Sequence, residues 1–157
     1  MTRLASVYLD SLGLPDVVPQ RARWRAVLLM ATAATVLIVA SILDPDTRGL
    51  GTHQQLGLPP CGFIRATGMP CVTCGYTTAF SLAARGDLIG ALGTQPAAAA
   101  LAIICAAALL IGLYAMITGM PLAPLMVPLR RGVTYWVMAA VVLGAWLYKI
   151  MTVRGII

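Results

Sequence analysis

"AVLLMATAATVLIVASIL", residues Ala26–Leu43, contains eighteen residues and no charge. A helix needs about 20 mostly apolar residues to cross the ~30 Å hydrocarbon layer of a bilayer, so this stretch predicts a membrane span at 26–43. A secretory signal peptide is the alternative, because Arg21, Arg23 and Arg25 precede the stretch. Signal-peptide cores are shorter, about 7–15 residues, and "SILDPDTRG" lacks a small-x-small cleavage site. We therefore expect the segment to be retained as the first span.

The whole chain shares this apolar character. Of its 157 residues, 60% are hydrophobic and 10% are charged, and the mean hydropathy is +0.89. The net charge of +6 does not indicate nucleic-acid binding, because the basic residues flank apolar runs and form no stripe with aromatic residues. The acidic residues are all aspartates outside the apolar runs, which argues against paired-carboxylate catalysis: Asp10, Asp16, Asp44, Asp46 and Asp87. The composition predicts a protein whose main partner is the lipid bilayer.

Residues typical of helix starts and stops predict two further spans in the second half of the chain. Pro96 fits a helix start and "TGMPLAP" fits a stop, which predicts a span at 96–118. "VTYWVMAAVVLGAWLYKIM" predicts a third at 133–151, with tyrosines and tryptophans near its ends as interfacial anchors. Lys149 is expected to snorkel toward the membrane surface. The sequence thus predicts an all-α integral membrane protein with three spans.

These spans divide the chain into a tail at 1–25 and a single membrane domain at 26–157. Arginines before the first span, and Arg130 with Arg131 before the third, place both segments in the cytoplasm under the positive-inside rule. The segment at 44–95 is then expected on the outer face. Small residues such as Ala139, Ala140 and Gly144 would let the spans pack closely on each other, on a second copy or on another membrane protein.

Cysteines mark the outward segment. Cys61, Cys71 and Cys74 form a C-x9-C-x2-C pattern, and Gly75 follows the last of them. Two cysteines in a C-x2-C-G turn are typical of a metal knuckle, with Cys61 as a third thiolate and His53 as a candidate fourth ligand for zinc. Cys105 lies in the middle of the second span and is interpreted as a packing residue.

Two other interpretations of the cysteines stay open. A C-x2-C pair at a helix start is also the arrangement for disulfide exchange, because the helix dipole lowers a thiol pKa. In an oxidising compartment, two of the three cysteines would instead form a structural disulfide. The odd number of thiols favours a metal over a purely disulfide account.

Two short helices are expected after the cysteine pair. Thr77 or Thr78 can cap the first, and Gly86 can end it in a left-handed conformation. Asp87 can cap the second, and Gly93 can close it. Neither is long enough to span, so both are expected to be interfacial or re-entrant helices.

The cysteine segment resembles the bacterial membrane family called domain of unknown function 2752 (DUF2752). The resemblance covers 61–96, where that family has a cysteine, a Thr-Gly-x-Pro-Cys-Pro-x-Cys-Gly-x-Thr-Arg-Ala block, a Gly-Asp pair and Ala-Leu before Asn-Pro. This chain departs from it at Val72, Thr78 and Gln95, which replace proline, arginine and asparagine. The resemblance implies a small multi-span bacterial membrane protein and no particular activity.

Taken together, these features predict a non-enzymatic protein of the bacterial cytoplasmic membrane. Its cysteine cluster would hold a structural or sensing metal and form a docking surface for membrane partners; no small-molecule substrate is indicated. The alternative is a membrane thiol-disulfide oxidoreductase in which Cys71 attacks and Cys74 resolves. A transporter is disfavoured, because Lys149 is the one ionisable residue inside a predicted span.

Overall fold

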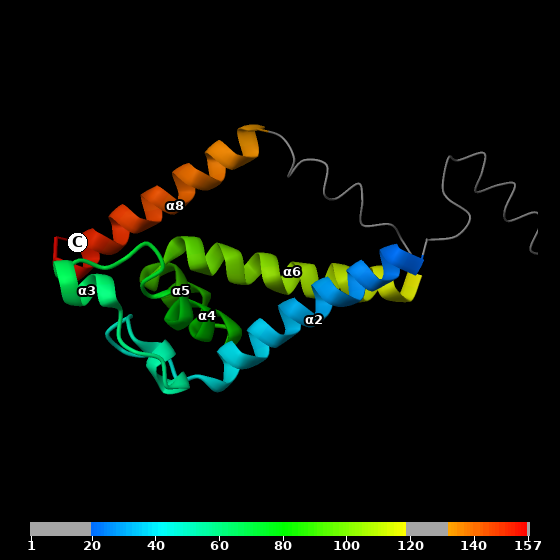
Figure 1. Cartoon of the computed structure of the whole chain (residues 1–157), viewed down its shortest axis with the longest axis horizontal. Coiled ribbons are helices and arrows are strands. Elements are labelled where there is room, and N and C mark those ends of the chain that lie inside the picture. Colours follow the sequence, from blue (N-terminus) through cyan, green and yellow to red (C-terminus); the bar gives the residue numbers. More distant parts are fainter. Residues whose placement is uncertain (1–19, 119–131, 157) are drawn as a thin grey trace, which may run out of the picture.

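The structure, a computed structural model, describes residues 20–118 and 132–156 (Figure 1). Within these ranges the chain forms helices and turns and no strand. Three helices are long and apolar enough to cross a membrane: α2 (Gln20–Ile42), α6 (Pro96–Thr118) and α8 (Gly132–Val153). The all-α fold class and the three predicted spans are therefore confirmed. Residues 1–19 of the predicted tail, and Arg130 and Arg131, lie outside the described ranges.

Helices α2 and α6 run antiparallel along each other (Figure 1). Ala26, Ala33 and Ala40 recur every seven residues of α2 and are all buried, because this spacing returns to the same helix face after two turns. On α6, Gly112 faces Met30 so closely that an added Cβ would lie 3.1 Å from the Met30 Cβ. Small residues thus set the distance between the two helices.

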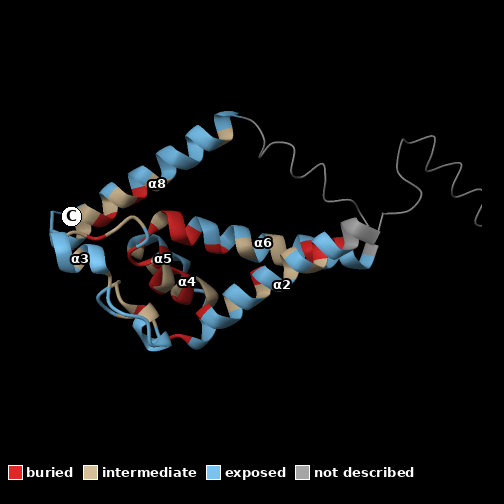
Figure 2. Cartoon of the chain, viewed as in Figure 1, coloured by how far each residue is buried: buried red, intermediate tan, exposed pale blue. Residues whose placement is uncertain are grey.

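Two short helices close one end of this pair. α4 (Tyr76–Ala84) and α5 (Leu88–Thr94) pack against α6, and α4 also packs against α2. Figure 2 shows buried residues gathered where these helices meet. The core there is built mostly of alanine, with one aromatic residue: Ala40, Ala79, Phe80, Ala91, Ala98, Ala99 and Ala102.

The boundaries of the short helices match the sequence prediction in part. Asp87 caps α5 by accepting the N–H of Gly90 at 2.8 Å, and Gly86 has a φ of +86° after α4, both as predicted. The cap predicted for α4 is wrong, because the helix begins after Gly75 without a side-chain cap. Thr77 and Thr78 lie inside α4 instead. Helix α5 also continues past Gly93 to Thr94.

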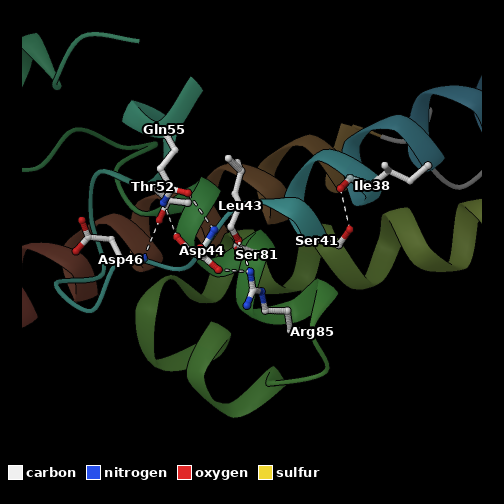
Figure 3. A network of polar contacts seen from close by, with 9 residues as sticks. All are labelled: Ile38, Ser41, Leu43, Asp44, Asp46, Thr52, Gln55, Ser81 and Arg85. Carbon is white, nitrogen blue, oxygen red and sulfur yellow. Dashed lines mark hydrogen bonds and ion pairs between the residues drawn. The ribbon is translucent and has the colours of Figure 1, made fainter. Parts of the chain in front are cut away.

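A loop with two further short helices joins α2 to α4: η1 (Thr52–Leu56), a 3-10 helix, and α3 (Gly62–Thr67). The buried Thr52 hydroxyl lies 2.8 Å from that of Thr78. It also accepts the N–H of Asp46 (Figure 3). Ser81 of α4 and Arg85, directly after α4, both donate to the carbonyl of Leu43, directly after α2. These bonds hold the loop against α4.

Helix α8 reaches the same end of the molecule with its C-terminal part (Figure 1). Trp146 donates to the Pro70 carbonyl at 2.9 Å, and Tyr148 donates to the Gly93 carbonyl at 3.0 Å. Lys149 is only 4% exposed, and its Nζ donates to the carbonyls of Gly49 (3.1 Å) and Thr94 (3.0 Å). The prediction that Lys149 snorkels is therefore wrong, since two inward backbone acceptors hold its ammonium group inside the protein.

Candidate metal centre

Three thiols meet where α3, α4 and their connecting turn come together. The sulfur atoms of Cys61, Cys71 and Cys74 all lie within 4.8 Å of one another. Sulfurs around a tetrahedral zinc ion with Zn–S bonds of ~2.3 Å lie about 3.8 Å apart, so this group is close enough to hold a metal ion. All four cysteines of the chain are free thiols. Cys105 packs against the alanine core from α6, as expected for a packing residue.

The two closer thiols belong to one tight turn. The N–H of Cys74 donates to the Cys71 carbonyl at 3.1 Å, and the N–H of Cys71 donates to the Cys74 sulfur at 3.2 Å. These bonds bring the two sulfurs to 3.1 Å. Gly75 leaves the turn at a φ of +88°, in the left-handed region that glycine adopts without the steric cost of a Cβ. The C-x2-C-G spacing therefore folds as the predicted knuckle.

Residues distant in the sequence brace this turn. The buried Gln95, at the end of α5, donates to the carbonyl of Val72 at 3.2 Å. Trp146 holds the carbonyl of Pro70, one residue before Cys71. Behind Gly75, an added Cβ would lie only 3.1 Å from the Nζ of Lys149. The backbone on both sides of Cys71 is thus held by hydrogen bonds from Gln95, at the end of α5, and from α8, and Lys149 lies close behind Gly75.

Sequence reasoning did not identify these bracing residues. The sequence feature that points to Gln95 is its departure from the family pattern, which has asparagine at this position. Trp146 and Lys149 were interpreted as membrane-surface residues, because their positions near the end of an apolar run are typical of that role. Their inward contacts depend on how α8 packs, which the local pattern does not contain.

The surroundings of the thiols separate their acidities. The backbone N–H of Ile64, at the start of α3, stabilises the Cys61 thiolate and lowers the pKa of Cys61 to about 7. Burial disfavours charge on Cys74 and, together with hydrogen bonds to the neighbouring thiols, raises the pKa of Cys74 to about 12. Cys61 therefore ionises before Cys74, which keeps its proton until a metal displaces it.

A cavity of about 590 Å³ opens beside the three cysteines. Its wall includes the polar side chains of Arg48, His53 and Arg65 and the apolar side chains of Leu58 and Tyr76. Arg48 is paired with Asp46 at 2.8 Å, and its hydrogen bonds lower the pKa of Asp46 to about 2, so that carboxylate stays ionised near neutral pH. The thiol group is thus accessible from a partly cationic space.

His53 shares this cavity and stands apart from the thiol group. Its ring atoms are not among the ligand atoms that lie within 4.8 Å of one another. Its Nε2 lies 3.2 Å from the carbonyl of Pro59, which can only accept, so Nε2 carries the proton in this contact. The structure therefore brings together three of the four predicted metal ligands, Cys61, Cys71 and Cys74.

Comparison with known proteins bears on the same segment. Searches among curated proteins and among solved structures find no match. A family model described as "Protein of unknown function (DUF2752)" matches residues 61–109, from the first cysteine to the middle of α6. The resemblance noted in the sequence is therefore confirmed over residues 61–109, which match the model of this family.

Proposed function

We propose that this protein is a small, non-enzymatic, multi-span membrane protein whose cysteine cluster is a structural or sensing metal site. One observation carries the proposal: three sulfurs from Cys61, Cys71 and Cys74 converge on one point beside a cavity. Thiolates favour zinc among the common structural metals, and iron is the second candidate. His53 or a ligand from outside the chain would complete the coordination.

Metal analysis tests this proposal. The full chain, purified in detergent without oxygen, is expected to contain about one zinc or iron ion per molecule, because thiolate sites bind these ions tightly. Cys61→Ser should lose most of the metal. Cys105→Ser is the matched control and should keep it, since Cys105 lies in α6 outside the thiol group. A correctly folded protein that takes up neither metal would overturn the proposal.

The proposed setting is the bacterial cytoplasmic membrane, with the metal site on its outer face. The arginines flanking the first and third spans support this orientation through the positive-inside rule. The site would then dock other membrane proteins or a second copy. Exposed apolar side chains along α8 offer a surface for such contacts or for lipid, among them Val133, Trp136, Val137 and Leu143.

A thiol-disulfide oxidoreductase is the second candidate, and the 3.1 Å between the Cys71 and Cys74 sulfurs favours it. The half-exposed Cys71 would attack and the buried Cys74 would resolve. Alkylation trapping across a redox titration separates the two functions. A reversible two-electron transition of this pair in metal-free protein, with no bound metal in the purified chain, would favour the enzyme.

A further inference from the structure

The cluster of Cys61, Cys71 and Cys74 provides three ligands, one fewer than a four-coordinate metal needs. A structural zinc site is closed by four protein ligands, whereas sites that act on small molecules keep one position open. The group found within the described residues holds three ligand atoms, all of them sulfur. The His53 ring is engaged with the Pro59 carbonyl and lies outside that group. All three cysteines line the cavity, so the fourth position faces it.

The charges around this position favour an anion. A divalent ion with three thiolates carries one net negative charge, and cationic side chains lie close to it. The Lys149 ammonium lies behind Gly75, and Arg48 and Arg65 are two of the residues that line the cavity. Asp46 balances Arg48, whereas Arg65 forms no ion pair with any residue in ranges 20–118 and 132–156. Arg65 therefore has a guanidinium group free for a ligand.

The chemistry of the thiolate-bound metal and of the Arg65 guanidinium defines the class of ligand. A metal held by three thiolates prefers a soft donor, and sulfur is the soft donor of small metabolites. A guanidinium group binds a carboxylate through two parallel hydrogen bonds. The cavity of about 590 Å³ falls within the ~300–1,000 Å³ typical of small-molecule sites. A single small molecule with both groups therefore fits the metal and Arg65 together.

We infer that the metal site binds a small organic thiol carrying a carboxylate, with its sulfur on the metal and its carboxylate on Arg65. This inference rests on the proposed metal site and assigns it to sensing. On binding, the thiol loses its proton to solvent, and its sulfur replaces a water molecule on the metal; no electron is transferred. The apolar part of the ligand would lie against Leu58 and Tyr76.

Cobalt substitution tests the inference, with 3-mercaptopropionate as the probe. Cobalt(II) is loaded into the full chain in detergent without oxygen, and the sulfur-to-metal charge-transfer band is followed as the probe is added. The band should grow by about a third as the sulfur count rises from three to four. Arg65→Gln should weaken probe binding about tenfold, the size of one lost charge-assisted contact, and leave cobalt binding unchanged.

Matched controls separate the possible failures. Arg154→Gln removes an exposed arginine that does not line the cavity and should leave probe affinity unchanged. 2-Mercaptoethanol, which lacks the carboxylate, should bind the wild type about as weakly as 3-mercaptopropionate binds Arg65→Gln. No cobalt uptake would overturn the metal site itself. If cobalt is taken up but its spectrum stays the same when either thiol probe is added, only the open fourth position is overturned. The same holds if His53→Gln changes the cobalt spectrum, because His53 would then be the fourth ligand.

Discussion

Gly75 holds the second cysteine in place through its backbone conformation. It has a φ of +88°, and a Cβ there would lie 2.9 Å from the Gly49 carbonyl oxygen. The left-handed conformation costs an L-residue roughly 1–2 kcal/mol, and the contact adds to it. We predict that Gly75→Ala lowers the free energy of unfolding by about 2 kcal/mol and weakens metal binding, because Cys74 is displaced. Thermal unfolding in detergent and a metal titration measure the two effects.

Gly93→Ala is the control for this change. Gly93 lies in α5, and a Cβ there would meet no atom within 4 Å. Alanine is the better helix former by about 1 kcal/mol, so this variant should be at least as stable as the wild type. If both variants lost stability equally, the strain assigned to Gly75 would be wrong.

The thiols are expected to react in a fixed order in metal-free protein. The pKa of Cys61 is lowered to about 7 and that of Cys74 is raised to about 12. Because the thiolate is the nucleophile, alkylation of Cys61 should rise as the pH passes through 7, while Cys74 stays unreactive through pH 9. Mass spectrometry of protein alkylated at a series of pH values measures both sites. In denaturant the two should react alike; a folded protein that shows no order would contradict the assignment.

At the scale of single residues, the cysteines could be predicted from the sequence, but the residues that hold their turn in place could not. Cys71 and Cys74 could be predicted as a pair because three residues of spacing fix their distance within one turn. His53 was proposed on residue type alone, and its ring contacts the Pro59 carbonyl in the structure. Gln95 reaches Val72 across 23 residues of sequence, a contact that depends on tertiary packing.

Helix α8 reaches the turn of the cysteine pair through Lys149, which lies behind Gly75. Its ammonium group donates to two partly buried carbonyls, those of Gly49 and Thr94. We predict that Lys149→Met, which keeps the length of the side chain, destabilises the protein by about 1–3 kcal/mol for each carbonyl left without a donor. Metal affinity should fall with it, because α8 also braces the turn before Cys71. Unfolding in detergent and a metal titration check both effects.

Tyr148→Phe is the comparison at the neighbouring position. It removes one exposed hydrogen bond, to the Gly93 carbonyl in α5, and should cost at most about 1 kcal/mol with metal affinity unchanged. Equal losses in the two variants would show that α8 acts as a general packing surface. A larger loss in Lys149→Met would support the ammonium as the link between α8 and the site.

The elements themselves were predictable in proportion to their length. The spans at 26–43, 96–118 and 133–151 agree with the long helices, because a long uncharged run has few alternatives to a membrane helix. η1 and α3 were not predicted: each has only five or six residues, too few for a hydrophobic period to show. Their positions come from contacts such as that between Thr52 and Thr78, which join distant parts of the chain.

In the whole molecule, the start of α2 and the cysteine cluster lie at different ends. The start of α2 and the start of α8 lie away from α3, whereas the end of α2, the start of α6 and the end of α8 lie on the side of the molecule that holds α3 and α4 (Figure 1). One end therefore carries the start of α2, and the other carries the cysteines. An orientation of the first span assigned by the positive-inside rule therefore also predicts the side of the membrane on which the cysteines lie.

We predict that Cys61 and Cys71 face the outside of the cell, because the positive-inside rule favours retention of the arginines before the first and third spans in the cytoplasm. In spheroplasts stripped of metal by a chelator, a membrane-impermeant maleimide should label these thiols in a Cys105→Ser background. A cysteine introduced as Gly132→Cys, at the start of α8, should be labelled only after the membrane is permeabilised. Labelling of Gly132→Cys alone in intact spheroplasts would reverse the orientation and move the site, with its small thiol ligand, to the cytoplasmic face.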